Sequence, residues 1–397
     1  MEAIARILPQ SQILNEWWHE VKDKFWDQNA KEQVKKLLKN LMESTLKEEL
    51  KEVIRREPYQ RGGLVYRNGH YQRSLITQFG LISGIHVPRL RSGSFKTQVF
   101  KRYKRHQAVV EDLIEGIFLA GVSTRRVGEA LSKLLETKVS HGTVSNITKR
   151  LDRQVKVFHE RPLLDEYQYL FLDGVNLKVR YNLAYHNRKV LTVYGVTVFG
   201  KKELIAFRQS QGESTEAWES LLWSLYHRGL KGQNLKLIVM DGAKGSHSAC
   251  LMVYPLIPSQ LCWAHKLRNV SDYCPKKHQE ECVEEAGSIY TADNRHDALD
   301  NFKVWRECWA DHCPKAIQCL QRDLDRLLYF YSCPKTHWKS IRTTNAIERS
   351  FREVRRRTRV FSCFSNQASC DRIIYAIFTH LNNNWKVTPI RKFTQFC

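Results

Sequence analysis

The spacing of apolar residues changes along the chain, and the first change separates a helix from a hairpin. Residues 13–56 carry apolar side chains at helical spacing, most clearly in KEQVKKLLKNLMESTLKEELKEVI, with charged residues on the other face. Pro58 ends that pattern. Residues 66–95 instead alternate as strands do, and the pair Asn68-Gly69 predicts the turn of a β-hairpin.

Residues 107–155 return to helical spacing and predict two helices joined by a turn. Ser123 is the expected cap of the first helix, and the sequence ETKVS is the expected turn. The second helix begins near Ser140 and exposes small polar residues near its start, namely Thr143, Ser145 and Asn146. This order is typical of a helix-turn-helix, whose second helix contacts DNA bases. A plain helical hairpin is the alternative.

From residue 167 the pattern becomes that of a mixed sheet. The segments YQYLFLDGVNLKVRY, KVLTVYGVTVFG and KKELIAFRQS predict three adjacent strands, followed by an amphipathic helix and the short buried strand LKLIVMDG. Adjacent strands suggest an antiparallel meander, and a helix followed by a buried strand suggests a parallel crossover. This order matches the RNase H-like arrangement. The pattern predicts mostly helices over residues 264–340. Two further helices are predicted near 345–357 and 371–385.

The charge balance adds a partner to this picture. The chain of 397 residues has 64 Lys and Arg against 41 Asp and Glu, a formal net charge of +23. DNA is a natural partner, because each neutralised phosphate releases counterions. A basic protein without a nucleic-acid partner is the alternative. No apolar run has the length of a membrane span, and the start lacks a secretory signal.

The cysteines indicate a reducing compartment. All eleven lie at or beyond Cys250, and an odd, unevenly spread set is unlike a secreted disulfide framework. We expect reduced thiols in a cytoplasmic protein that is associated with the nucleoid when it is bound to DNA.

Basic residues accompany the predicted hairpin and the predicted helix-turn-helix. Those expected to contact DNA are Arg67, Arg73, Arg89, Arg91, Arg125, Arg126 and Lys149. For the hairpin, phosphate contact and a solvated basic face are equally good interpretations of the pattern.

Two carboxylates, Asp173 in LFLDG and Asp241 in LIVMDG, follow buried apolar runs. A strand that ends before glycine places a carboxylate at the rim of a sheet. Carboxylate oxygens suit Mg²⁺, and two ions roughly 3.5–4 Å apart stabilise both oxygens of an in-line displacement at phosphorus. Glu348, on an arginine-rich predicted helix, is the candidate third ligand. Each Asp-Gly alone is more often a simple turn, so the hypothesis depends on their joint placement.

Long motifs in the right order support this hypothesis. They are YRNGHYQRSLITQFG, VPRLRSGSF, YLFLDGVNLKVR, DGAKG followed by CWAHKLRNV, and TTNAIERSFREVRRRTRV. The chain resembles the mutator-type transposases of bacterial insertion sequences, a branch of the DDE transposases. The resemblance implies metal-dependent DNA cleavage and strand transfer at terminal inverted repeats. It maps the catalytic metal ligands onto Asp173, Asp241 and Glu348, with two Mg²⁺ ions for which Mn²⁺ can substitute.

The resemblance also implies an all-helical insertion in an RNase H-like core. The expected partners are double-stranded DNA, as element ends and target, and further copies of the chain in a homodimer or higher oligomer, with no membrane. Two other functions are considered: an inactive transposase-derived DNA-binding regulator, and an RNase H-like nuclease that cuts without joining.

Cys262 and His265 form a CxxH sequence to which the resemblance also extends. We expect a structural role, or a role in orienting the catalytic groups, for this pair and for Asn345. Zinc is the alternative, because Cys274, His278 and Cys282 follow, although the spacing is unlike that of a zinc finger.

The helix that carries Glu348 is dense in arginine. Arg352, Arg355 and Arg359 share the face of Glu348 at helical spacing and are expected to contact phosphates beside the cut. The rival expectation pairs these arginines with carboxylates of the helical insertion, namely Glu280, Glu281, Glu284 and Glu285.

The predicted fold class is α+β with several domains. The predicted boundaries are 1–58 for a helical region, 59–104 for the basic β-hairpin, 105–160 for the helix-turn-helix, 161–263 for the first part of the RNase H-like core, 264–340 for the all-helical insertion, and 341–397 for the C-terminal helices of the core.

Overall fold

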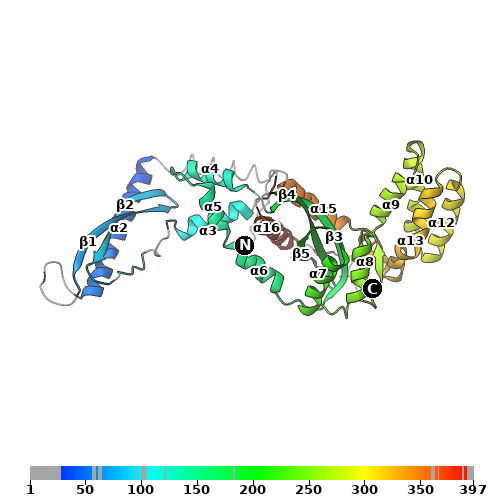
Figure 1. The fold of residues 1–397 in the computed structure, drawn as a ribbon, viewed down its shortest axis with the longest axis horizontal. Helices are drawn as coiled ribbons and strands as arrows, with labels where there is room; N and C mark the ends of the chain where they lie inside the picture. The colour runs from blue at the N-terminus through cyan, green and yellow to red at the C-terminus, as the bar shows by residue number, and fades with distance from the viewer. Residues whose placement is uncertain are drawn as a thin grey trace, which may run out of the picture. The chain divides into compact units, whose positions relative to one another are not determined.

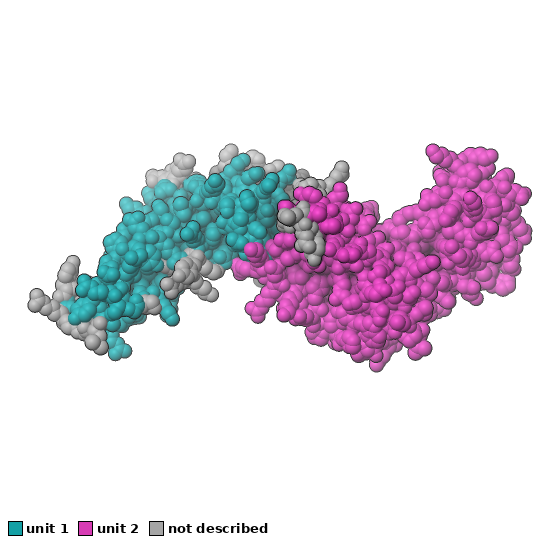
Figure 2. Space-filling view, in the orientation of Figure 1, with its two compact units in different colours: residues 1–118, 122–148 teal, residues 119–121, 149–397 magenta. Residues whose placement is uncertain are grey.

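The computed structural model, drawn as a ribbon in Figure 1, has two compact units. The first contains residues 1–118 and 122–148, and the second contains residues 119–121 and 149–397 (Figure 2). The residues described are 28–55, 60, 65–93, 95–99, 105–119, 122–181, 184–358, 363–364, 366–386 and 389–390. The part of the predicted first helix before Gln28, and Arg359, lie outside them. Both units mix helices with a β-sheet.

The first unit begins with a helix that covers a two-stranded sheet. Its elements are α2 (Gln28–Ile54), β1 (Arg67–Thr77), β2 (Gly80–Leu90), α3 (Ala108–Leu119), α4 (Thr124–Leu134) and α5 (His141–Thr148). Leu46 of α2 is fully buried against the apolar face of the hairpin, together with Leu75, Ile82, Ile85 and Val87. The hairpin therefore depends on α2 for its core, since an isolated pair of strands is marginal in water.

The β-hairpin turns between Thr77 and Gly80, so the turn predicted at Asn68-Gly69 is wrong. Both residues lie inside β1, where the pairing with β2 is irregular. Gly69 has φ 64°, the left-handed conformation that favours glycine. The Asn-Gly pair thus forms a bulge in the strand instead of a turn.

The observed turn consists of Gln78 and Phe79, because Thr77 pairs with Gly80 across the hairpin. The hydroxyl of Thr77 donates to the carbonyl of Gly80 at 2.9 Å and accepts from the amide of Phe79 at 3.2 Å. Gly80 has φ 109°, which other residues rarely adopt. A buried threonine and a glycine fix this turn.

Helices α3, α4 and α5 share a second core. Its buried members are Val110, Ile114, Val127, Leu131, Leu135, Val139, Val144 and Ile147. Ser123 caps α4 and accepts from the amide of Arg126 at 3.4 Å, as predicted. Ser140 precedes α5 and accepts from the amide of Thr143 at 3.1 Å. The two helices and their turn are as predicted, and their role as a helix-turn-helix stays a prediction.

The close approach of α4 to the turn gives a stability prediction for Gly128. A Cβ atom added there would lie 2.7 Å from the backbone oxygen of Val139, which has little freedom to move. Gly128→Ala is therefore expected to lower the free energy of unfolding by about 1–3 kcal/mol. Hydrogen exchange of the α4 and α5 amides in the full chain measures the change.

The matched control is Gly116→Ala in α3, where an added Cβ meets nothing within 4 Å. Alanine is the better helix former, so this change is expected to be neutral or to stabilise by up to about 1 kcal/mol. Equal protection in the two variants would contradict the close contact at Gly128.

The second unit is built around a five-stranded sheet. Its elements up to the last strand are α6 (Leu151–Glu160), β3 (Tyr167–Tyr181), β4 (Ala184–Thr197), β5 (Lys202–Ser210), α7 (Thr215–His227), β6 (Leu237–Met240), α8 (Lys244–Val253) and β7 (Ser259–Leu261). The strand order is β5-β4-β3-β6-β7. The first three strands pair antiparallel, and β6 and β7 add parallel to β3. The predicted meander and parallel crossover are confirmed, while β7 was not predicted.

The C-terminal helix α16 (Gln367–Lys386) protects one edge of this sheet. Its Asn382 accepts from the amide of Leu204 in β5 at 2.8 Å and donates to the carbonyl of the same residue at 3.1 Å. Phe378 of α16 packs against Phe207 of β5, with ring centroids 5.4 Å apart. The edge strand is thus covered by a helix, one of the ways in which proteins blunt unpaired strands.

The chain between β7 and the last two helices is helical, as predicted for residues 264–340. It contains α9 (Trp263–Asp272), η1 (Lys276–His278), α10 (Gln279–Glu285), α11 (Gly287–Thr291), α12 (Arg295–Trp309), α13 (Pro314–Leu327), η2 (Tyr329–Ser332), η3 (Lys335–His337) and α14 (Trp338–Ile341), and α15 (Asn345–Thr358) follows. Helices α9, α10, α12 and α13 gather together (Figure 1). Among the described residues no helix is long and apolar enough to cross a membrane.

Candidate active site

Asp173 lies inside a strand, not at its end as predicted. Strand β3 continues to Tyr181 and pairs with β4 throughout, with Asp173 opposite Thr192. What ends beside Asp173 is the parallel pairing with β6, whose last pair is Leu172 with Met240. The continuation has a physical reason, because the residues after Asp173 alternate between buried apolar and exposed polar side chains and keep their partner in β4.

Asp241 follows β6 directly, as predicted, and so occupies the position beside Asp173 at this rim of the sheet. Its Oδ1 accepts from the amide of Ala243 at 3.1 Å. Gly242 has φ 97°, so the chain turns sharply from the strand towards α8. Asp173 is 7% exposed and its Oδ1 accepts from the amide of Gly174 at 2.7 Å, while Asp241 is half-buried. The two carboxylates share one rim through strand pairing.

Glu348 joins these residues from the first turn of α15. Its amide donates to the carbonyl of Thr344 at 3.0 Å. Its carboxylate faces two basic side chains of α9: Nε2 of His265 is 3.4 Å from Oε1, and Nη2 of Arg268 is 3.2 Å from both oxygens. His265 and Arg268 are three residues apart on one helix and so share a face. Helices α9 and α15 therefore meet over the Glu348 carboxylate.

Cys262 fastens the start of α9 to the start of α15. The amide and the hydroxyl of Thr344 each donate to the buried Cys262 sulfur at 3.2 Å. The same hydroxyl lies 3.4 Å from Nδ1 of His265, and the Trp263 amide donates to the carbonyl of Arg342 at 3.1 Å. These contacts set the distance between His265 and Glu348. Cys262 therefore helps to position His265 and Glu348 relative to each other.

Electrostatics couple the CxxH pair to the carboxylates. Burial opposes a thiolate, yet the hydrogen bond and charge of His265, with Thr344, lower the pKa of Cys262. In return Cys262 raises the pKa of His265 despite the burial of the ring, and the charges of Asp173 and Glu348 act in the same direction. Asn345 is exposed at the first position of α15, and within the described part of the chain its side chain makes no hydrogen bond.

The charges of both other carboxylates act on Asp173. Burial raises its pKa to about 6, the Gly174 amide and His265 oppose that shift, and the charges of Asp241 and Glu348 add to it. A buried acid among acids is stabilised by a nearby cation. The three carboxylates offer only oxygen donors, which is the set that Mg²⁺ and Mn²⁺ prefer. The residues therefore fit a divalent cation.

The ligand spacing adds a detail to this fit. Among the described residues, the only His, Cys, Asp or Glu ligand atoms gathered within 4.8 Å of one another in a group of three are cysteine sulfurs. Asp173, Asp241 and Glu348 are thus neighbours that do not converge on one point.

The basic candidates lie in both units and differ in exposure. Those that are exposed are Arg89, Arg91, Arg125, Arg126, Asn146, Lys149, Arg352 and Arg355, and those that are half-buried are Arg67, Arg73, Thr143 and Ser145. The guanidinium of Arg89 stacks on the ring of Tyr71, 4.8 Å from its centroid. Thr143 is engaged by Ser140, with the two hydroxyl oxygens 3.0 Å apart. Asn146 is thus the most exposed of the three polar residues predicted on α5.

The arginines of α15 bear on the rival expectation of pairing with the insertion. In the part of the chain that is described, neither Arg352 nor Arg355 has an ion pair, and Arg356 pairs within the helix with Glu353 at 2.8 Å. Glu285, one of the expected partners, instead accepts from the indole of Trp309 at 2.8 Å. Phosphate contact stays a prediction for Arg352 and Arg355.

The sequence matches the family described as "Transposase, Mutator family" over residues 11–388. The transposase for insertion sequence element ISRM5 from Rhizobium meliloti (strain 1021) is 34% identical over 322 residues, which cover 81% of this chain and 80% of that one. The transposase for insertion sequence element IS256 in transposon Tn4001 from Staphylococcus aureus is 32% identical over 345 residues, 83% of this chain and 84% of that one.

Among solved structures, the Drosophila P element transposase strand transfer complex is similar with a TM-score of 0.32 and 12% identity, over 72% of this chain and 89% of that chain. This likeness is too distant to carry any argument.

Proposed function

The chain belongs to the Mutator family of transposases, and from this premise we propose that it cuts and rejoins DNA at the ends of an insertion sequence, using Asp173, Asp241 and Glu348. The family is one of DNA-cutting and rejoining enzymes. The observation that carries the assignment of residues is the placement of Asp173 and Asp241 at one rim of the sheet, where the charges of Asp241 and Glu348 both act on the buried Asp173.

The proposed core is RNase H-like. Three antiparallel strands followed by two parallel ones, in the order β5-β4-β3-β6-β7, support that description. The helices between β7 and α15 correspond to the all-helical insertion between the second carboxylate and the third. This insertion supplies His265 and Arg268, so it takes part in the site as well as separating its members.

The three carboxylates would hold two Mg²⁺ ions, or Mn²⁺ in their place. When bound, such ions neutralise charge on the attacking and leaving oxygens of the phosphodiester. The protein's own contribution is positioning: strand pairing fixes Asp173 beside Asp241, and the contact of Cys262 with Thr344 fixes α15 and thus Glu348. Arg268, with its side chain 59% exposed, is placed to meet a phosphate beside Glu348.

The proposed partners are the terminal inverted repeats and the target DNA, bound by a homodimer or higher oligomer. Exposed basic residues in both units support DNA binding. Such action on DNA would occur in the cytoplasm, at the nucleoid. A DNA-binding regulator would not need the gathered carboxylates, and a nuclease would cut without joining.

Incubation with DNA separates these three functions. The purified full chain is mixed with Mg²⁺ or Mn²⁺ and a duplex carrying the DNA that flanks its reading frame. Products in which an element end is joined to a second duplex support the transposase. Cut ends without joining would favour the nuclease, and specific binding without cutting would favour the regulator.

End recognition gives a further prediction for the first unit. Arg125→Ala with Arg126→Ala is expected to weaken binding to all duplexes and to lower the slope of log affinity against log salt by about 1 per lost phosphate contact. Asn146→Ala is expected to reduce the preference for terminal repeats without changing the slope, because base contacts specify and phosphate contacts position. Binding titrations at several salt concentrations measure both.

Lys133→Ala is the matched control, since Lys133 is exposed near the other end of α4. The full chain is used, because a fragment that begins after α2 would lose the cover of the hairpin. An unchanged salt slope in the double arginine variant would remove α4 from the DNA surface.

A further inference from the structure

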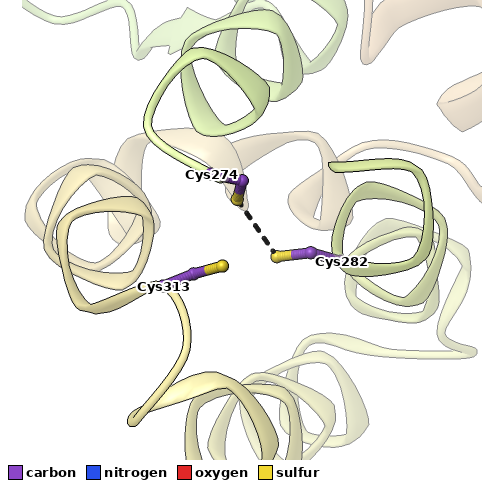
Figure 3. A group of neighbouring side chains, drawn as sticks. All are labelled: Cys274, Cys282 and Cys313. Carbon is purple, nitrogen blue, oxygen red and sulfur yellow. Dashed lines mark hydrogen bonds between the residues drawn. The ribbon is translucent and has the colours of Figure 1, made fainter. Parts of the chain in front are cut away.

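Three cysteines of the helical insertion meet in space, although the third lies far from the other two along the chain. Cys274 follows α9, Cys282 lies in α10, and Cys313 immediately precedes α13 (Figure 3). Their sulfur atoms all lie within 4.8 Å of one another, and those of Cys274 and Cys282 are 3.5 Å apart. All three side chains point towards one another from separate elements, and all three residues are buried.

This spacing is that of metal ligands. A disulfide would require about 2.05 Å between two sulfurs, and these cysteines are free thiols in the structure. Zinc–sulfur bonds of about 2.3 Å at tetrahedral angles place sulfurs about 3.8 Å apart. The observed distances thus need only small side-chain movements to reach coordination.

The surroundings hold the cluster in place through its backbone. The indole of Trp305 donates to the carbonyl of Cys282 at 2.9 Å, and Gln279 donates to the carbonyl of Cys274 at 3.3 Å. The amide of Cys313 donates to the carbonyl of Trp309 at 2.8 Å. Such fixed backbones are what a structural metal site requires, because ligand orientation is set before the ion arrives.

His278 is the candidate fourth ligand, although its ring nitrogens lie outside the group of sulfurs that are within 4.8 Å of one another. It stands midway between Cys274 and Cys282 in the sequence CPKKHQEEC. Its Nε2 is buried and has no hydrogen-bond partner among the described residues. Its ring lies against His312 and Trp309, with centroid distances of 4.9 and 5.6 Å. A buried ring nitrogen without a partner carries a desolvation cost that metal coordination would remove.

We propose that Cys274, Cys282 and Cys313 bind one structural Zn²⁺, with His278 as the fourth ligand. The three thiols release their protons to solvent as three Zn–S bonds form, with no change of oxidation state. Burial raises the pKa of the Cys274 thiol to about 11 and also raises the pKa of the Cys282 thiol. Soft sulfur ligands select zinc over the Mg²⁺ that the carboxylates prefer.

A bound ion would link three helices of the insertion. The ion would join α9 to α10 and to the start of α13, at the end of α9 opposite to Cys262. Helix α9 also carries His265 and Arg268, the two basic side chains that face Glu348. Zinc would therefore support the helix that lines the carboxylate site without being part of that site. Neither Cys262 nor His265 belongs to the cluster.

Elemental analysis of the full chain tests the proposal. Protein purified under reducing conditions is expected to hold about one zinc per chain. Replacement by Co²⁺ is expected to give thiolate-to-cobalt charge transfer and the intense visible bands of a tetrahedral site. Asp173→Asn, which alters an oxygen donor, is expected to change neither result. Cys308→Ser is the matched control, because Cys308 is exposed in α12 and outside the cluster.

Cys282→Ser is expected to lose the ion, and His278→Ala to bind it at least about tenfold more weakly. The wild-type cobalt spectrum decides the question even if Cys282→Ser fails to fold. Wild-type protein without zinc and without thiolate-to-cobalt charge transfer would overturn the proposal. A Cys274–Cys282 disulfide that persists under reducing conditions would overturn it equally.

Discussion

Asp241→Asn is expected to abolish DNA cleavage and joining, and Asp173→Asn and Glu348→Gln are expected to do the same. Each change removes one charged oxygen ligand but keeps the size of the side chain, so loss of activity reports charge and not packing. Removal of one preorganised charge from a site of this kind costs about 4 kcal/mol of transition-state stabilisation, a fall in rate of about 10³ or more. Single-turnover joining of labelled element ends in Mg²⁺ measures the loss.

Glu353→Gln provides the matched control on the same helix. Glu353 pairs with Arg356 in α15, and we assign it no role among the carboxylates. Its replacement is expected to leave the joining rate within a few-fold of wild type. DNA binding by all four variants should persist, because the basic residues are untouched. Wild-type joining by any of the three carboxylate variants would remove that residue from the proposed site.

The strands and helices with strong periodicity could be predicted from sequence, because burial alone decides them. Helix α7 is amphipathic, as predicted, and buries one face with Trp218, Leu221, Leu222 and Leu225. Strand β6 is a four-residue apolar run that is fully buried between β3 and β7. In such segments local pattern and tertiary packing agree, and the position of Asp241 after β6 followed from that agreement.

The errors arose where a local signal had two structural outcomes. An Asn-Gly pair supplies a left-handed residue, and such a residue suits a turn or a bulge equally well. The choice at Gly69 was made by the pairing of β1 with β2 and by the cover that α2 gives to the hairpin. At Asp173 the same ambiguity applied to Asp-Gly, and pairing with β4 kept the strand extended.

The cysteine cluster shows a different limit. Cys274 and Cys282 are close in sequence, and zinc was an alternative because they follow Cys262 and His265, although the spacing is unlike that of a zinc finger. Cys313 joins them only because α13 packs against α9 in the folded insertion. No spacing rule connects residues that helix packing brings together. From the sequence, Cys274 was therefore considered together with Cys262 and His265, which lie at the carboxylate site instead. β7 was missed for a related reason, since Ser259–Leu261 lacks an apolar run.

Metal-free Asp173→Asn is expected to be more stable than wild type near neutral pH. Burial raises the pKa of Asp173 to about 6 in the folded state, from the ordinary value of 3.8. The folded protein therefore keeps a proton that the unfolded chain has lost, and wild-type stability falls as pH rises between these two values. The full difference is about 3 kcal/mol, because one pKa unit corresponds to about 1.4 kcal/mol. Asparagine does not ionise and escapes this loss.

Asp371→Asn separates the pH effect from the metal effect. Burial also raises the pKa of Asp371, on α16, to about 6. Its carboxylate accepts from Gln209 of β5 at 2.6 Å, so its environment is separate from that of Asp173. Both variants should gain stability over wild type as pH rises from about 4 to 6. Added Mg²⁺ should then stabilise wild type and Asp371→Asn, since an ion that binds only the folded state raises its stability. Asp173→Asn should not respond.

Chemical unfolding in chelator and in Mg²⁺, at several pH values, measures both effects. A wild-type stability that is flat between about pH 4 and 6 would contradict the burial of an uncompensated Asp173 carboxyl. Equal stabilisation of Asp173→Asn and wild type by Mg²⁺ would place the ion elsewhere. If both expectations hold, the acid that weakens the metal-free fold is the acid that the ion binds, and the cost of burying it at neutral pH is offset when the site is filled.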